Sequence, residues 1–258
     1  MINALVLAGS SNREELEQQE NVDNKALLEI NGAPMIVHVL SVLEETPSIS
    51  EIALITSSSQ VRNIEAGGKK LDEKYRIIEE QGSLLENLEA GLRQMPQEEP
   101  CLVVTSDIPL MHTGAVEDFI RRCDTLEKDF YYPIIFKEDC EKAYPGVKRT
   151  YLKIKDGSFT GGNLTLVKPS GILKNIDRLH LVFSYRKKPW KYARLLSPLL
   201  ILKFLFKKVS IKELEEYIEH LLSLQARAVP TPYAEIGTDV DKPDDLEMVR
   251  KILGSSTV

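Results

Sequence analysis

The first 125 residues alternate short apolar runs with stretches of amphipathic helical spacing. The apolar runs of strand length cover 4–8, 52–56, 75–79 and 102–105. The stretches in which apolar residues recur every three or four positions cover 34–45, 83–95 and 114–123. Short strands that alternate with longer helices are typical of βαβ units. The pattern therefore predicts an α/β fold whose parallel sheet is covered by helices on both faces.

The second half of the chain is less regular. The strands that we expect there are 131–136, 151–154 and 163–167, with the Gly-rich stretch 157–162 as a turn, and the helices are 211–224 and 243–253. The last helix is opened by Pro243, and acidic residues lie near its positive end. Since the chain has no repeats, low-complexity tracts or Gly/Ser linker, we expect one domain over 1–258, with a basic and apolar helical insertion at about 178–225.

Composition and charge restrict the function only broadly. The chain is 43% apolar and 28% charged with a net charge of −6, which is ordinary for a soluble globular protein and gives no general attraction to nucleic acid. Cys101, Cys123 and Cys140 form no CxxC pair, so neither a disulfide framework nor a zinc knuckle is indicated. No signal-peptide pattern follows Met1, and a cytoplasmic location is expected.

The end of the first predicted strand is a candidate phosphate site. Leu7, Ala8, Gly9 and Ser10 combine small side chains with backbone N–H groups that could approach a phosphate or a base. The stretch matches neither GxGxxG nor GxxxxGK[ST], so the dinucleotide and P-loop fingerprints both fail. Lys25 follows a polar stretch and could neutralise a triphosphate, although a solvated loop lysine is the alternative.

Carboxylates provide the second candidate. Asp107 follows a buried strand, where it either caps a turn or presents an anion to a ligand at the carboxyl edge of a parallel sheet. Asp239 and Asp241 are expected to point to opposite sides of an extended segment, so that one of them meets Asp107. Two carboxylates with open water positions suit Mg²⁺ bound to an NTP, whereas a charged helix N-terminus is the structural alternative.

Ser83 begins the helix predicted over 83–95. With Glu86 three residues later it has the spacing of a capping box, and this structural role would explain it fully. The functional alternative is a contact with a nucleobase.

Taken in order, these motifs resemble a known family. Strand-LAGS, a lysine followed by LLEINGAPMI, Gly-Ser at a helix start, SDIPLM and DVDKPDDL are similar to the MobA-like NTP transferase family, which includes molybdenum cofactor guanylyl- and cytidylyltransferases. The resemblance covers the first 125 residues, the TGGN strand near 163 and the last 25 residues. It implies a Rossmann-like three-layer sandwich with a mainly parallel sheet, of the nucleotide-diphospho-sugar transferase type.

The resemblance also implies roles for individual residues. An NTP would lie along Leu7–Ser10, with Lys25 on its phosphates and Ser83 near its base. The implied Mg²⁺ ligands are Asp107 and Asp241, with Asp239 in reserve, and the implied acceptor contacts are Gly162 and Asn163. The implied reaction is Mg²⁺-dependent transfer of NMP from CTP or GTP to a phosphorylated acceptor, with release of pyrophosphate.

The chain departs from the family in its first loop. Relatives have Gly-Gly and then Gly-x-Arg-Met-Gly, whereas this chain has Gly-Ser-Ser-Asn before Arg13. Eleven residues, five of them acidic, then separate Arg13 from Lys25. Arg13 is the candidate signature arginine, but acidic side chains beside a triphosphate are unfavourable unless they face away. A non-catalytic nucleotide-binding or membrane-associated protein is therefore one alternative, and a glycosyltransferase that uses a nucleotide-sugar is another.

The segment 178–212 reverses the charge of the chain. It contains ten basic residues and no acidic one, and it includes the apolar run LLSPLLILKFLF at 195–206. This run is too short to span a bilayer, which takes about 20 residues. A helical hairpin on the core or at a homodimer interface, peripheral contact of 186–208 with the inner face of an anionic membrane, and an anionic acceptor site are the three interpretations.

Overall fold

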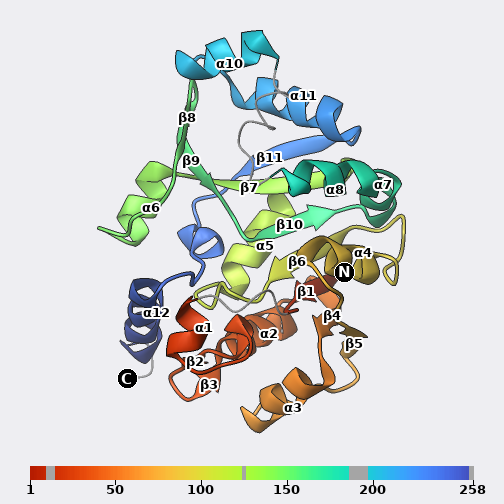
Figure 1. Cartoon of the computed structure of the whole chain (residues 1–258), viewed down its shortest axis with the longest axis vertical. Helices are drawn as coiled ribbons and strands as arrows, with labels where there is room; N and C mark the ends of the chain where they lie inside the picture. The colour runs from red at the N-terminus through yellow and green to blue at the C-terminus, as the bar shows by residue number, and fades with distance from the viewer. Residues whose placement is uncertain (10–14, 124–125, 186–196, 256–258) are drawn as a thin grey trace.

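The computed structural model describes residues 1–9, 15–123, 126–185 and 197–255 (Figure 1). Nine strands form one mixed sheet in the order β5-β4-β1-β6-β10-β7-β9-β8, with β11 pairing to β7. These strands are β1 (Ile2–Leu7), β4 (Ile49–Thr56), β5 (Tyr75–Glu79), β6 (Cys101–Thr105), β7 (Phe130–Phe136), β8 (Leu152–Ile154), β9 (Gly157–Gly161), β10 (Leu164–Val167) and β11 (Ala226–Pro230). Among them, β9 and β10 run against the rest, so the expected mainly parallel sheet is confirmed.

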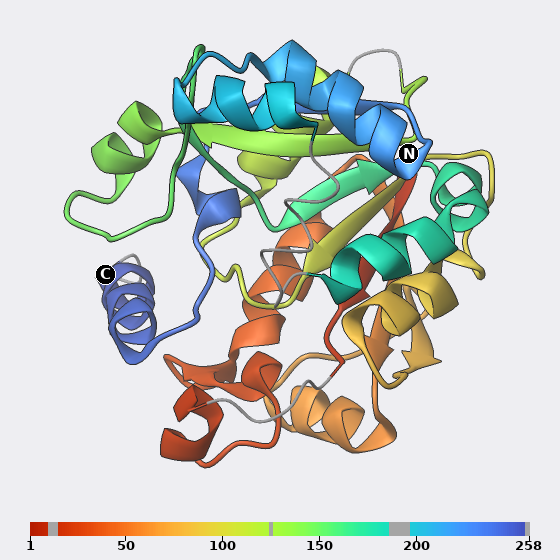
Figure 2. The same ribbon diagram turned by 45° about the horizontal axis from the view of Figure 1, so that its top comes forward.

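Helices cover both faces of this sheet (Figure 2). One face carries α2 (Met35–Glu45), α3 (Ser58–Ala66) and α5 (Thr113–Arg122); the other carries α4 (Leu84–Leu92), α7 (Pro169–Lys174), α8 (Ile176–Ser184) and α11 (Ile211–Leu222). The side chains of β1 show why helices are needed on both faces of the sheet. Ala4 and Val6 pack into one core and Leu5 and Leu7 into the other, because successive side chains of a strand point to opposite faces.

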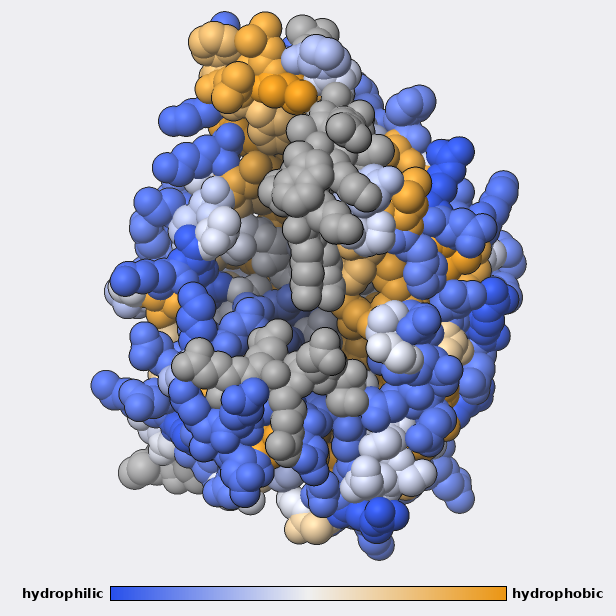
Figure 3. Space-filling model, in the orientation of Figure 1, coloured by the Kyte–Doolittle hydropathy of each residue, from blue (hydrophilic) through white to orange (hydrophobic). Residues whose placement is uncertain are grey.

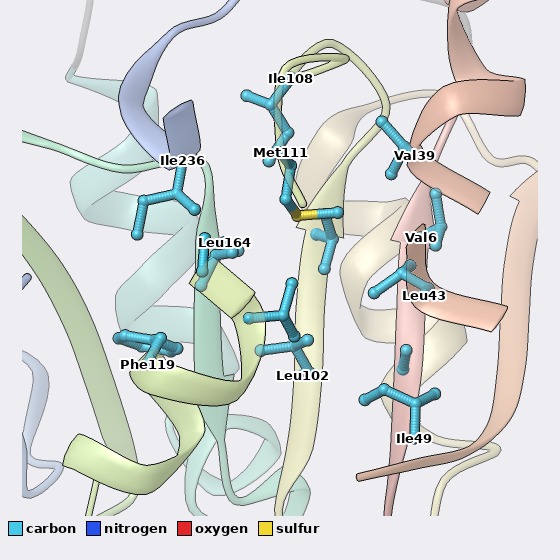
Figure 4. Close-up of a cluster of buried hydrophobic side chains, with 14 of the residues drawn as sticks. Val6, Val39, Leu43, Ile49, Leu102, Ile108, Met111, Phe119, Leu164 and Ile236 are labelled. Carbon is cyan, nitrogen blue, oxygen red and sulfur yellow. The ribbon is translucent and has the colours of Figure 1, made fainter. Parts of the chain in front are cut away.

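The first core lies between the central strands and α2 and α5 (Figure 4). The side chains that meet there include Val6, Val39, Leu43, Leu102, Phe119 and Leu164. The remaining helices are α1 (Glu15–Gln19), η1 (Lys25–Leu27), α6 (Lys137–Ala143), α10 (Pro198–Leu205), η2 (Ala234–Gly237) and α12 (Pro243–Ser255).

The strand order places a reversal between β1 and β6. The chain runs from β1 outward to β4 and β5, and then returns to β6 on the other side of β1, where Leu7 pairs with Thr105. In open α/β sheets, ligands bind outside the carboxyl ends of the strands at such a reversal. The ends of β1 and β6 are therefore where a functional site is expected.

One sequence-based expectation about the sheet is wrong. The stretch 157–162 is not a turn, because Gly157–Gly161 forms β9 and pairs with β8 on one side and β7 on the other. The turn lies at 155–156, and Gly157 follows it with φ +135°, a conformation that favours glycine. The glycines and serine of this stretch disfavour a strand, but pairing on both edges satisfies the backbone and outweighs that local preference.

Strands β9 and β10 follow each other along the same edge of β7, and Gly162–Asn163 interrupts the pairing between them. The N–H of Gly162 donates to the carbonyl of Pro133, and the N–H of Thr105 donates to the carbonyl of Asn163 (3.1 and 3.0 Å). The interruption therefore ties the end of β6 to the second half of the sheet.

Asn31 and Gly32 form a hairpin turn. It joins β2 (Glu29–Ile30) to β3 (Ala33–Pro34), with φ of +53° at Asn31 and +88° at Gly32. Positive φ at both central residues is the signature of the two-residue hairpin turn that matches strand twist.

The insertion is helical where the structure describes it. Helices α8 and α11 pack on the sheet, and α10 packs beside β8 and β9. Residues 186–196, which carry half of its basic side chains, lie outside the described residues. Within the described part of the chain, no helix has the length and apolar character required to cross a membrane.

Phe119 tests the packing of the first core. Its side chain is fully buried between α5 and the sheet, so Phe119→Ala is expected to lower the free energy of unfolding by about 3–5 kcal/mol. Ile77→Ala, at a side chain that is 41% exposed, is the control and should change it by less than about 1 kcal/mol. Equal effects of the two changes in urea unfolding would contradict this account of the core.

Candidate active site

Asp107 is held at the carboxyl end of β6. The hydroxyl of Thr105 donates to its Oδ1 (2.5 Å), and the N–H of Val240 donates to its backbone carbonyl (3.0 Å). The first contact orients the carboxylate, and the second brings the chain between η2 and α12 across the end of the sheet. Ile108, which follows, is fully buried and anchors the turn.

Three carboxylates meet at this point. One oxygen from each of Asp107, Asp239 and Asp241 lies within 4.8 Å of the others. The expectation that Asp239 and Asp241 point to opposite sides is wrong, because residues two apart in an extended chain share a side. Val240, between them, is fully buried and packs in the opposite direction, against the cluster formed with α12.

Lys25 joins the carboxylates from the other side of the reversal. Its Nζ lies 2.9 Å from Oδ2 of Asp107 and forms a second ion pair with Asp241. The preceding residue, Asn24, fixes this position: its buried side chain donates to the carbonyl of Ala8 and accepts from the N–H of Ala26, both at 2.8 Å. Asn24 was not among the residues predicted for the site, although asparagine is a preferred residue at a helix N-cap and stands directly before the lysine.

The charges in this cluster shift one another's protonation. Burial, and then the nearby carboxylates of Asp241 and Asp107, raise the pKa of Asp239 to about 6. Burial also acts to raise the pKa of Asp241, but the contact with Lys25 outweighs it, and that pKa lies below its ordinary value. Burial tends to lower the pKa of Lys25, but the two aspartates outweigh it, so the pKa is raised and Lys25 stays charged. The cluster therefore carries more negative than positive charge near neutral pH.

The loop that follows β1 packs against the start of α4. Ala8 donates its N–H to the carbonyl of Ile55 (3.1 Å), so this N–H is already engaged. At Gly9, a Cβ atom would lie 2.2 Å from Nδ2 of Asn87, so a larger residue would displace the side chain of Asn87. Asn87 is buried and accepts from the N–H of Gln81 (2.5 Å), which makes it a second positioning residue that the sequence analysis missed. Ser10 and Arg13 lie outside the described residues.

Ser83 occupies the N-cap of α4, as the capping interpretation predicts. Its Oγ accepts from the N–H of Glu86 (3.3 Å), and its side chain is exposed. The base contact that the resemblance implies stays a prediction.

One acidic residue of the long first loop is neutralised by the last helix. Glu20 pairs with Arg250 of α12 (Oε2 to Nη2, 2.7 Å), and this hydrogen bond lowers the pKa of Glu20. Its charge is therefore compensated away from the carboxylate cluster.

A pocket of about 590 Å³ adjoins the carboxylates. It is lined by the loop 145–150, by Thr160 of β9 and by residues of the stretch 237–248, which include Asp239 and Asp241. Its basic residues are Lys148, Arg149 and Lys242. Lys148 and Arg149 could not be predicted from the sequence, because they lie in an irregular loop far from any recognised motif.

Gly162 and Asn163 do not line this pocket. The N–H of Asn163 donates to the carbonyl of Ile236 (2.7 Å), and its own carbonyl accepts from Thr105. Both backbone groups therefore connect segments of the fold that support the site. At Gly162, a Cβ atom would lie 2.8 Å from Cγ of Pro133. Their expected contact with an acceptor stays a prediction, whereas the structure shows a supporting role.

The donor set fits a hard divalent cation. All three side chains offer carboxylate oxygens, which Mg²⁺ prefers, and they come from two segments that converge at the sheet edge. The ammonium of Lys25 already lies between two of them, which shows that positive charge is favoured at this point. A bound cation would also offset the neighbouring negative charges that, together with the larger effect of burial, raise the pKa of Asp239.

The raised pKa of Asp239 has a consequence for stability. Because the folded-state pKa of about 6 lies above that of an unfolded aspartate, the folded chain binds an extra proton between about pH 4 and 6, and ionised Asp239 destabilises the fold above that range. In the presence of a chelator, Asp239→Asn is therefore expected to raise the free energy of unfolding at pH 7 by about 1 kcal/mol. The gain should shrink as the pH falls through 6.

Asp244→Asn is the matched control. Asp244 lies in the first turn of α12, where a negative charge is favourable, so its neutralisation should slightly lower the free energy of unfolding. A loss of stability in Asp239→Asn at pH 7, measured by urea unfolding, would contradict the electrostatic account of the cluster.

Comparison with known proteins identifies the family. A solved structure described as a hypothetical transferase from Thermus thermophilus has 34% sequence identity and a TM-score of 0.82, and the match covers 95% of this chain and 99% of that one. The 2-C-methyl-D-erythritol 4-phosphate cytidylyltransferase of Shouchella clausii is 25% identical over 180 residues. That match covers 67% of this chain and 66% of the relative, just under two thirds of its length.

A third comparison concerns the fold alone. The crystal structure of 4-diphosphocytidyl-2C-methyl-D-erythritol synthase from Anaerococcus prevotii has 13% identity and a TM-score of 0.62, and the match covers 98% of both chains. The family model described as the MobA-like NTP transferase domain matches residues 4–220, which include most of β1, Lys25 and Asp107. The chain belongs to the MobA-like NTP transferase family.

Proposed function

We propose that this protein transfers a nucleoside monophosphate from an NTP to a phosphorylated small molecule and releases pyrophosphate. The observation that carries the proposal is the convergence of Asp107, Asp239 and Asp241 with Lys25 at the reversal between β1 and β6. Phosphoryl groups gather negative charge in the transition state, so positioning and electrostatic stabilisation provide most of the catalysis.

The nucleotide is proposed to lie along the loop after β1. The absence of a side chain at Gly9 lets this loop lie against Asn87 at the start of α4, which brings Ser83 and the end of β1 to the same side of the sheet. CTP is the favoured nucleotide because the curated relative compared above is named as a cytidylyltransferase. Ser10 and Arg13 are proposed to contact the phosphates as well.

The three aspartates are proposed to hold Mg²⁺, which would supply positive charge against the α-phosphate. Lys25 has a separate part in the proposal. Since the pKa of Lys25 is raised, its ammonium stays charged at neutral pH and can exchange a carboxylate contact for a phosphate oxygen of the nucleotide. Asn24 holds the backbone of Lys25 to that of Ala8, so the lysine stays aligned with the nucleotide loop.

The acceptor is proposed to occupy the 590 Å³ pocket beside Asp239 and Asp241. Lys148 and Lys242 offer exposed positive charge for an acceptor phosphate. Arg149 is held by the carbonyl of Gly237 and the hydroxyl of Thr238, so it fixes the pocket wall. An acceptor phosphate oxygen would attack the α-phosphorus in line; the new P–O bond forms as the bond to the β-phosphate oxygen breaks. A phosphate oxygen is already ionised at neutral pH, and it requires no general base.

Pyrophosphate release with each of CTP, GTP, UTP and ATP, in the presence of Mg²⁺ and a set of phosphorylated sugars and polyols, tests the proposal. We expect release with CTP and one class of acceptor. If no NTP gives pyrophosphate with any acceptor, although CTP binds in equilibrium dialysis, the chain is a nucleotide-binding protein and the proposal is wrong.

Asp107→Asn tests the carboxylate cluster. The substitution keeps the size of the side chain but removes its charge, so Mg²⁺-dependent turnover should fall by about a hundred-fold or more, while the far-ultraviolet circular dichroism stays unchanged. Asp72→Asn is the control, since Asp72 is an exposed aspartate that caps a turn far from the cluster. Turnover of Asp107→Asn within two- or three-fold of the parent would remove Asp107 from the site.

A further inference from the structure

Helix α10 is apolar on two faces. Its inner side is anchored by Leu200, which is 8% exposed and packs with Ile134 and Ile154 of the sheet. On its outer side, Leu202, Leu205 and Phe206 are 51%, 74% and 66% exposed. Positions three and four apart on a helix share a face, so these three side chains form one patch rather than scattered contacts. Figure 3 shows an apolar patch at the end of the molecule where Figure 1 places α10.

Three lysines adjoin this patch along the chain. Lys203 pairs with Glu213 of α11, whereas Lys207 and Lys208 are exposed, and no carboxylate of the described chain lies within 4.0 Å of either ammonium. The sequence contains no acidic residue over 178–212, although the whole chain has a net charge of −6. We call Leu202, Leu205 and Phe206, with Lys203, Lys207 and Lys208, the α10 tip.

The backbone at the end of α10 fixes this arrangement. Lys207 has φ +53°, its N–H donates to the carbonyl of Phe204 (2.9 Å), and the N–H of Lys208 donates to the carbonyl of Lys203 (2.8 Å). This is the Schellman pattern, in which an apolar residue after the helix usually folds back and covers the last turn. In this helix the two residues that would make that contact are Lys203 and Lys208, and neither is apolar. The chain therefore does not cover the apolar side chains at the end of α10.

The position of the α10 tip suits contact with a flat surface. It lies at one end of the longest axis of the molecule, above β8 and α11 (Figure 1). Strand β6, which Asp107 follows, and helix α12, which Asp239 and Asp241 precede, lie lower in the same view. A surface that meets the tip therefore lies far from β6 and α12. An exposed apolar patch of this kind marks an interaction site for a protein or a membrane.

The charge of the α10 tip favours an anionic membrane over a second copy of this chain. In a two-fold dimer built on this patch, the same lysines would face each other, because a two-fold interface brings identical surfaces together. An anionic lipid surface instead neutralises the lysines and receives the apolar side chains at its interface. We propose that the α10 tip docks this protein on anionic membranes. The apolar side chains enter the interface, and the lysines contact lipid phosphates.

Vesicle flotation of the full chain tests the proposal. We expect the protein to float with vesicles of phosphatidylcholine and phosphatidylglycerol, and to bind pure phosphatidylcholine much more weakly. Leu205→Ser with Phe206→Ser should weaken binding by about ten-fold or more, because two apolar side chains leave the interface. Lys207→Gln with Lys208→Gln should weaken binding to anionic vesicles by about ten-fold and reduce its dependence on salt.

Leu181→Ser is the matched control, since Leu181 is a leucine of α8 that is 50% exposed outside the α10 tip. It should bind vesicles as the parent does, and all variants should keep the parent's near-ultraviolet circular dichroism. The proposal is overturned if the parent does not float with anionic vesicles, or if the Leu205/Phe206 variant floats equally well. It is also overturned if the parent is a dimer that this variant dissociates while neither binds vesicles, in which case a second copy covers the patch.

Discussion

The crowding of three carboxylates around one ammonium is the constraint on which the rest of this structure depends. Two unit charges 4 Å apart repel by about 4 kcal/mol at an effective dielectric constant of about 20, so Asp107, Asp239 and Asp241 cannot be brought together without compensation. Lys25 supplies part of it through its two ion pairs, and a proton shared by Asp239 and Asp241 supplies another part as the pH falls toward 6. Such a cluster is stable only on a rigid frame.

The frame is the reversal of strand order between β1 and β6. It places the end of β1, with Asn24 bonded to Ala8, beside the end of β6, with Asp107 oriented by Thr105. The chain between η2 and α12 then crosses the same edge, and the N–H of Val240 fixes it to the backbone of Asp107. Each charged group is therefore positioned by a backbone contact of its own or of its neighbour. The same edge opens onto a pocket that is lined by both basic and acidic side chains and is large enough for a small phosphorylated molecule.

The layered fold was predictable from the sequence because the spacing of apolar residues distinguishes its strands from its helices. The central strands are short apolar runs, and the helices that cover them have apolar residues at helical spacing, as α2 and α5 show. The glycine-rich β9 was not predictable, because its strand character comes from pairing with β7 and β8 rather than from its own residues. Local preference is weak where pairing on both edges decides.

The candidate site was predictable only in part, for a related reason. Asp107 and Lys25 stand out because each follows a recognisable element, and the ordered motifs of the family add Asp239 and Asp241. Asn24, Asn87 and the loop that carries Lys148 do not stand out, because their roles depend on contacts between segments distant in sequence. The side on which Asp239 lies was misjudged, although the spacing of two residues in an extended chain is enough to place it beside Asp241.

The most direct measurement is a crystal structure of the protein with CTP and Mn²⁺, in which anomalous scattering locates the metal. The account predicts a Mn²⁺ peak about 2.1 Å from carboxylate oxygens of Asp107 and of Asp239 or Asp241. It also predicts CTP phosphates beside the end of β1, with the ammonium of Lys25 on a phosphate oxygen. Ordered CTP at another part of the sheet, or at this edge with Mn²⁺ bound away from all three aspartates, would contradict it.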